Sequence, residues 1–232
     1  LNIKSVLNKH LSFLEKPKDQ ILNIISQSIR NPECNTNAIG LYGVKGVGKT
    51  AITKSIAEAL DRPFKMICLG GASDSSYMTG HDFTYVGSTP GRLIQLLIEC
   101  RSMNPVVLID ELDKISETEH GKELIGTLIH LTDTTLNKTY NNDKYFAGLE
   151  FDLSKVLFIF TYNDFTKVDK ILADRLFKIK IDNYTFKEKF EICKKHLINT
   201  VLKEFNLKNV SFTDSAIEHI IHLSKDDGMR NI

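Results

Sequence analysis

The stretch that decides the fold is Gly43–Thr50, which reads Gly-Val-Lys-Gly-Val-Gly-Lys-Thr. It matches the pattern G-x-x-x-x-G-K-[ST], whose glycines let backbone N–H groups turn inward around phosphate oxygens. In that pattern the lysine reaches the outer phosphates and the hydroxyl binds Mg²⁺. We therefore expect the whole loop to bind a nucleotide, through Gly43, Val44, Lys45, Gly46, Val47, Gly48, Lys49 and Thr50.

The flanking sequence supports this reading of the loop. An apolar run with β-formers, Ala38–Tyr42, precedes it, and a helical pattern with Ile52, Ile56 and Leu60 on one face follows it. The alternative is a glycine-rich turn with a chance Lys-Thr, but strand, loop and helix in this order are what the motif requires.

Composition sets wider limits. The 232 residues are 42% hydrophobic, which is enough for a real core, and the net charge of +1 gives no global field toward nucleic acid or membrane. Four separated cysteines, with no Cys-x-x-Cys pair, suggest reduced thiols in the cytosol or a similar compartment such as the mitochondrial matrix. No apolar run approaches the ~20 residues of a membrane span. The chain begins at Leu1 rather than Met, which suggests a fragment of a longer protein.

Alternating patterns predict the fold class α/β, a parallel sheet of five strands between helices. The candidate strands are 38–42, 64–68, 105–109, 156–160 and 177–181, and helical patterns cover 1–30, 49–60, 90–101 and 121–131. We expect a polar linker at 31–37 and a surface loop at 132–142. From about residue 183 two amphipathic helices, 185–205 and 213–223, predict a small helical unit. The predicted domains are 1–182, which binds nucleotide, and 183–232, an incomplete helical lid.

A second chemical signal ends the strand at 105–109. Four apolar residues run into Asp110 and Glu111, so both carboxylates should lie at the carboxyl edge of the sheet, beside the loop. Asp110 suits a ligand of Mg²⁺ together with Thr50, and Glu111 suits the group that polarises an attacking water. An ordinary acidic turn is the alternative, and it loses weight because a full phosphate loop precedes it.

Three further polar residues are weaker candidates. Asn163 follows the next strand and could hold the lytic water, although asparagine is also common in turns. Arg175 and Arg230 are of the type that stabilises charge on a transferred phosphoryl group. Taken singly, each arginine is more simply a surface charge.

The order of these motifs resembles the AAA+ ATPases, and within them the ATPase module of the Lon proteases. The segments whose sequences most resemble Lon are 69–72, Leu-Gly-Gly-Ala, and 80–95, Gly-His-Asp-Phe-Thr-Tyr-Val-Gly-Ser-Thr-Pro-Gly-Arg-Leu-Ile-Gln. The stretches 110–114, 151–156 and 228–231 are also similar. The resemblance covers nearly the whole chain.

The resemblance implies roles for particular residues. Asn163 would be the sensor in the sheet, Arg175 an arginine finger acting on the neighbouring subunit, and Arg230 the sensor arginine of the lid. Tyr85 and Val86 would be the pore-loop pair that grips unfolded polypeptide, although Tyr85 could instead be a packed loop aromatic. A flat ring on a loop flanked by glycines can press on any backbone, which suits such a role.

The chain also differs from the usual Lon sequence at several positions. Val44-Lys45 stands where two prolines are usual, Phe13 replaces a glycine near the expected adenine site, and Tyr162 replaces an alanine. The usual Leu-Asp-Pro-Glu-Gln run is not found around Asp133, in the region of the second pore loop.

The resemblance implies ATP and Mg²⁺ as cofactors, unfolded or damaged proteins as substrates and a homo-oligomeric ring, a hexamer. The near-neutral charge argues against nucleic acid as the main partner, and the short apolar runs argue against a membrane. The parent would be an ATP-dependent serine protease, whose Ser-Lys peptidase site lies outside this chain. Two rivals stay open, a remodelling or scaffold ATPase without peptidase activity and a monomeric P-loop kinase.

Overall fold

The computed structural model describes residues 3–31, 38–70, 76–207, 210–224 and 228–229. Its centre is one sheet of five parallel strands in the order β2-β3-β4-β1-β5. The strands are β1 (Ala38–Tyr42), β2 (Phe64–Cys68), β3 (Val106–Asp110), β4 (Leu157–Tyr162) and β5 (Phe177–Lys180). The predicted α/β fold is confirmed, and the bounds predicted for β1 and β2 match the observed ones.

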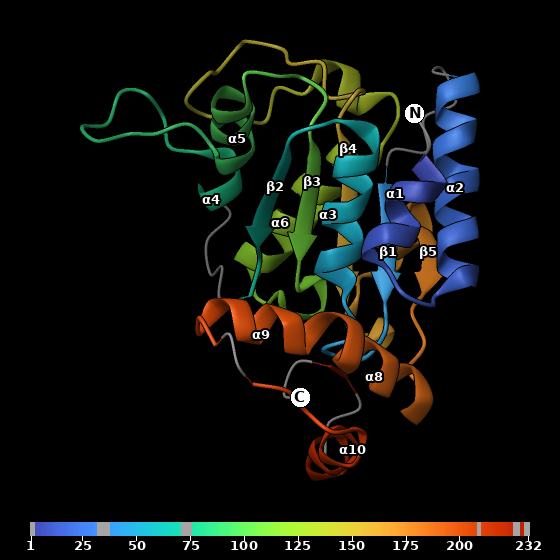
Figure 1. The fold of residues 1–232 in the computed structure, drawn as a ribbon. Coiled ribbons are helices and arrows are strands. Elements are labelled where there is room, and N and C mark those ends of the chain that lie inside the picture. The colour runs from blue at the N-terminus through green and yellow to red at the C-terminus, as the bar shows by residue number, and fades with distance from the viewer. Residues whose placement is uncertain (1–2, 32–37, 71–75, 208–209, 225–227, 230–232) are drawn as a thin grey trace.

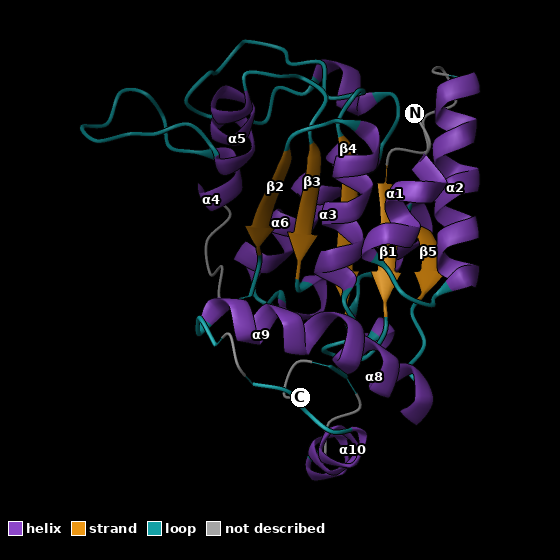
Figure 2. Cartoon of the chain, viewed as in Figure 1, coloured by secondary structure: helices purple, strands orange, loops and turns teal. Residues whose placement is uncertain are grey.

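Helices cover both faces of the sheet (Figures 1 and 2). One face packs against α1 (Ile3–His10), α2 (Glu15–Arg30) and α3 (Lys49–Leu60). The other packs against α4 (Ser76–Thr79), α5 (Arg92–Cys100), α6 (Glu119–Thr132) and α7 (Lys170–Arg175). All six residues of β4 are buried, as expected for a central strand covered on both sides.

The carboxyl ends of the strands meet at one edge, which is the lower edge of the sheet in Figure 1. Two short 3₁₀ turns continue the chain there, Leu112–Lys114 after β3 and Phe165–Lys167 after β4. Because ligands of open parallel sheets bind outside these carboxyl ends, this edge is where the candidate site lies.

One expectation for the sheet domain is confirmed and another is corrected. Residues 3–30 are helical as expected, in two helices with Pro17 near the start of the second, and the helices are separated where Phe13 and Leu14 adopt left-handed backbone with φ of 63° and 56°. The stretch 132–142 is not a surface loop throughout. It contains a 3₁₀ turn, Leu136–Thr139, in which Asn137 is fully buried, and Tyr140 is buried beside it with a bridge to Phe151.

The chain after the sheet is helical, as predicted. α8 (Phe186–Ile192) passes through a π-helical turn, Cys193–Leu197, into α9 (Ile198–Glu204), so 186–204 is one continuous helix. A capping box between Thr185 and Glu188 fixes its start. α10 (Asp214–Leu223) begins after its N-cap, Thr213, whose side chain accepts the backbone N–H of Ala216. The linker expected at 31–37 lies, except for its first residue, outside the described residues.

None of the helices in the described part of the chain is both long and apolar enough to cross a bilayer.

Candidate nucleotide site

The phosphate loop joins the end of β1 to the start of α3. Its second and third glycines, Gly46 and Gly48, have φ of 85° and 88°, a conformation that residues with a Cβ rarely adopt. Gly48 is also the N-cap of α3, so the first N–H groups of the helix point out of its end. These amides form a donor set that suits phosphate oxygens.

Lys49 links the loop to the neighbouring strand end. Its ammonium group donates to the carbonyl oxygens of Gly43 at 2.6 Å and Val44 at 2.9 Å, and to Oδ1 of Asn163 at 2.8 Å. The contact between Lys49 and Asn163 joins residues 114 positions apart in the sequence. It follows from the sheet order, because β1 lies beside β4 with Tyr42 opposite Tyr162. The predicted sensor Asn163 therefore does lie at the phosphate loop.

Asp110 is held at the end of β3. Its Oδ1 accepts hydrogen bonds from the Thr161 hydroxyl and from the backbone N–H of Glu111, the latter at 3.1 Å. Thr161 is fully buried, so its hydroxyl is satisfied by this carboxylate within the sheet. The second Asp110 oxygen and the Thr50 hydroxyl are hard oxygen atoms, the type of ligand that Mg²⁺ prefers.

Glu111 has a strained backbone and a close neighbour. Its φ of 62° places a residue with a long side chain in the left-handed region, which costs about 1–3 kcal/mol and is typical of functional positions. The carboxylate lies against Gly70, where a Cβ would stand 1.7 Å from Oε2. Only glycine at position 70 leaves room for this orientation of the glutamate.

The thiol of Cys68, at the end of β2, contacts the same carboxylate. Its Sγ lies 3.6 Å from Oε2 of Glu111. Desolvation raises the pKa of the thiol, and the negative charges of Glu111 and Asp110 raise it further. Cys68 therefore stays a protonated donor to Glu111 at neutral pH.

The chain beyond the sheet also contacts the phosphate loop. The Tyr184 hydroxyl donates to the Val47 carbonyl at 3.3 Å, and the backbone N–H of Met229 donates to the Gly46 carbonyl at 2.9 Å. Burial raises the pKa of Tyr184 to about 12, so the hydroxyl remains a donor. Gly228 sits so close that a Cβ would lie 2.4 Å from the Lys45 carbonyl oxygen.

Arg175 lies outside this cluster. It ends α7 shortly before β5, whose Phe177 pairs with Ile39 near the start of β1, so Arg175 lies toward the amino-end edge of the sheet. Its guanidinium donates to Asp133 at 2.6 Å. Hydrogen bonds from Thr135, and then from Arg175, hold the pKa of Asp133 well below its usual range. Arg230 lies outside the described residues.

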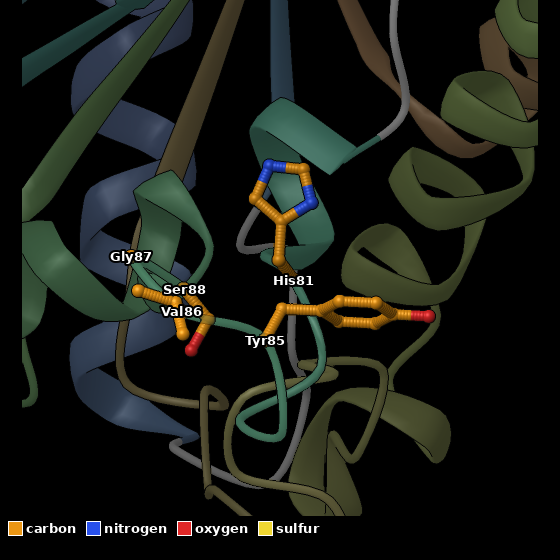
Figure 3. A pocket seen from close by; sticks show the side chains of 5 residues that line it. All are labelled: His81, Tyr85, Val86, Gly87 and Ser88. Carbon is orange, nitrogen blue, oxygen red and sulfur yellow. The ribbon is translucent and has the colours of Figure 1, made fainter.

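The predicted pore-loop pair lies on an exposed loop between α4 and α5. This loop projects from the body of the molecule at the left of Figure 1. The Tyr85 side chain is 70% exposed and Val86 is fully exposed. The two side chains point in different directions around a shallow hollow of about 410 Å³, which His81, Gly87 and Ser88 also line (Figure 3). The exposure shows that Tyr85 is not a packed loop aromatic.

The base of this loop, in contrast, is firmly attached. Gly91 N–H donates to the buried Asp143 carboxylate at 2.8 Å, and the same carboxylate accepts the N–H groups of Tyr145 and Phe146. A Cβ on Gly91 would lie 2.0 Å from the Met78 carbonyl oxygen. Residues 78–91 therefore leave and rejoin the body at one fixed point.

Several contacts at the site had no signal in the sequence. Nothing in the local pattern indicated that Cys68 and Gly70 would meet Glu111, or that Tyr184 and Met229 would reach the loop.

Two of the differences from the usual Lon sequence have visible structural consequences. Phe13 keeps the positive φ that favours glycine. The Tyr162 ring stacks on Tyr42 with centroids 5.7 Å apart and planes 4° from parallel.

A glycine loop after a strand, a helix beginning at its lysine and an acidic pair on a nearby strand end define the class of P-loop nucleotide-binding proteins. The family model that matches the chain, over residues 39–183, is the ATPase family associated with various cellular activities (AAA). The chain belongs to this family. The predicted AAA+ fold and ATPase class are confirmed.

Three similar proteins indicate which members of the AAA family this chain resembles. The chain is 36% identical to a Lon protease homolog of Acanthamoeba polyphaga mimivirus, 37% identical to the Lon protease of Clostridium acetobutylicum and 39% identical to that of Cytophaga hutchinsonii. These alignments cover 99–100% of this chain but only 23–30% of each relative. The resemblance to Lon is confirmed, and the chain spans less than a third of the length of these relatives.

Proposed function

We propose that this chain is the ATPase module of a Lon-like ATP-dependent protease, and that it drives unfolded protein substrates through a ring. One observation carries the proposal. The phosphate loop, the Asp110-Glu111 pair and Asn163 come from three different strand ends and converge at one edge of the sheet, joined by the Lys49–Asn163 and Thr161–Asp110 hydrogen bonds.

The donors at this edge fit ATP and Mg²⁺. The amides around Gly46 and Gly48, the start of α3 and Lys49 would hold the phosphates, while Thr50 and Asp110 would hold the metal. ATP, when bound, would supply the γ-phosphoryl group, which passes to water as its bond to ADP breaks. Glu111 would accept a proton from the attacking water, and Asn163 would orient that water.

Residues away from this edge complete the proposal. Arg175 lies toward the opposite edge of its own sheet, which fits a role at the nucleotide of a neighbouring subunit. Arg230 is assigned to the lid on the resemblance alone. Tyr85 and Val86 are exposed on a projecting loop, where they could press on a polypeptide of any sequence. We place the domain boundary near residue 182, because Cys193, Ile217 and Ile221 form a small apolar cluster of their own.

The remaining parts of the proposal are coarser. The whole protein would form a homo-oligomeric ring, a hexamer by resemblance, and would work in the cytosol or another reducing compartment. The three cysteines in the described residues, Cys68, Cys100 and Cys193, are free thiols, in agreement with that setting.

A mixing experiment tests the shared site. Arg175→Ala and Glu111→Gln should each abolish ATP hydrolysis by the full-length protein. Mixing and reassembling the two variants should restore part of it, because a subunit with intact Arg175 then faces one with intact Glu111. A monomeric P-loop kinase predicts no recovery on mixing, and that result would contradict a site shared between subunits.

A second measurement separates the protease from a remodelling ATPase. The full-length protein is incubated with an unfolded polypeptide and ATP, and peptide products are followed. ATP-dependent cleavage supports the protease. ATP hydrolysis with unfolding but no cleavage would support the remodelling factor.

A further inference from the structure

Asn163 is fixed from both sides. The residue two positions before it, Thr161, donates to Asp110 on β3, and Tyr162 stacks on Tyr42 of β1. The residue after it, Asp164, donates its backbone N–H to Oδ2 of Asp113 at 3.2 Å. The chain on either side of Asn163 is thus tied to carboxylates of the segment that begins at the end of β3.

Asp113 is an unusual residue for its environment. It lies in the 3₁₀ turn that directly follows Glu111, and it is only 7% exposed. Its Oδ1 is buried and has no hydrogen-bond partner among the described residues. A buried carboxylate with one oxygen unpartnered is costly, and an apolar side chain of similar size would fill the space at lower cost. The carboxylate therefore needs a reason beyond packing.

We infer that Asp113 is a positioning residue for ATP hydrolysis: by holding the N–H of Asp164, it fixes the Asn163 amide relative to Glu111. The two groups that must act on one water, Glu111 and Asn163, come from different strands. Asp113 lies two residues from Glu111 along the chain and bonds the residue next to Asn163. The inference rests on the proposed role of Asn163.

The geometry explains why a misplaced asparagine would matter. The Asn163 side chain is exposed at the strand end and its contact with Lys49 leaves its backbone position to be set elsewhere. Loss of the Asp113 acceptor would release the turn Phe165–Lys167, which starts at Asp164, from the turn Leu112–Lys114. A displacement of about 1 Å at a reacting centre can cost up to about a hundredfold in rate.

The test compares two substitutions at Asp113 in the full-length protein. Asp113→Leu removes the acceptor and keeps the branched shape of the side chain, whereas Asp113→Asn keeps an acceptor oxygen. Asp113→Leu should lower kcat for ATP about ten- to a hundredfold, with the Kd for ATP within about twofold of the wild-type value. Asp113→Asn should retain most of the activity. The control, Asp152→Leu, removes an exposed carboxylate that accepts one backbone N–H far from the site, and should leave kcat unchanged.

A double-mutant cycle distinguishes positioning from general structure. If Asp113 acts through Asn163, Asp113→Leu should slow an Asn163→Ala variant by less than about twofold. Multiplicative losses would overturn the inference, as would normal kcat in Asp113→Leu or equal inactivity of the Asn and Leu variants. Should Asp113→Leu fail to fold, Asp113→Ala carries the same comparison. If Asn163→Ala alone leaves kcat unchanged, the proposed role of Asn163 fails instead.

Discussion

The strand ends around the phosphate loop and the loop between α4 and α5 are held in opposite ways. At the strand ends, hydrogen bonds tie the end of β3 to the end of β4 and Lys49 of the phosphate loop to Asn163, so that even the exposed Asn163 is fixed. The α4–α5 loop is anchored at its base, where the Gly91 N–H bonds Asp143, while Tyr85 and Val86 at its tip face solvent. Chemistry on a phosphoryl group needs fixed distances, whereas a surface that grips many sequences must adapt to each.

The largest effect should come from the fixed region. Glu111→Gln should lower ATP turnover by about a hundredfold or more, because the amide cannot accept a proton from water. ATP binding should persist, since the phosphate contacts come from other residues. Phosphate release and nucleotide affinity are the measurements. The control is Glu117→Gln, which changes an exposed glutamate in the next loop. Undiminished turnover in Glu111→Gln would remove the residue from the mechanism.

The base of the α4–α5 loop should behave as part of the fixed region. Asp143→Ala should lower the free energy of unfolding by roughly 3 kcal/mol, because three backbone N–H groups lose their shared acceptor. Denaturant unfolding measures this. Asp82→Ala, at an exposed position within the loop, is the matched control and should cost far less. If Asp143→Ala and Asp82→Ala lower the free energy of unfolding equally, the base of the loop is not held more firmly than the rest of the loop.

A pH series extends the comparison to Arg175. The pKa of Asp133 is depressed, so the stability that its hydrogen bonds contribute is present above the ordinary carboxyl pKa, about 3.9, and is lost as pH falls below it. Asp133→Asn should therefore be less stable than wild type by about 1 kcal/mol at pH 7. Unfolding at pH 7, 5 and 3 should show this difference shrinking only at the lowest pH. A difference that is constant with pH would assign the effect to packing.

The smallest effect is expected at the loop tip. Tyr85→Ala should change the free energy of unfolding by less than about 0.5 kcal/mol, because the side chain is 70% exposed. Thermal and denaturant unfolding measure it. A loss well above that value would mean that the ring packs against the body in solution, and would weaken its assignment to substrate contact.

Much of this arrangement was predictable from local sequence. The phosphate loop, the strand before it and the helix from Lys49 follow from glycine spacing and apolar periodicity, and Asp110-Glu111 follows from a buried strand that ends in acids. β4 runs two residues further than predicted, because the Thr161 hydroxyl finds Asp110 and can remain inside the sheet. In a sequence pattern a polar residue suggests that the strand has ended. In the structure the strand can continue through such a residue when another strand supplies its hydrogen-bond partner.

The remaining features depend on partners distant in sequence. Asp113 looks like an ordinary acid after a strand, until Asp164 is found against it. Asn137 and Tyr140 made 132–142 look polar and exposed, although tertiary packing buries both. Phe13 itself gives no local sign of its left-handed backbone, although the glycine that is usual at this position in Lon chains agrees with a positive φ. Such features are set by tertiary contacts, which periodicity and spacing do not encode.

The contacts of Tyr184 and Met229 also bear on the affinity of the phosphate loop. A peptide group is planar, so its carbonyl and the following N–H point in opposite directions. Since Met229 and Tyr184 bond the carbonyls of Gly46 and Val47, they orient two consecutive peptide planes and with them the N–H groups of Val47 and Gly48. If anion affinity depends on the orientation of these N–H groups, it is thermodynamically linked to whether Tyr184 and Met229 hold the loop. Anion binding then changes the equilibrium for forming these two contacts by the same factor by which the contacts change anion affinity.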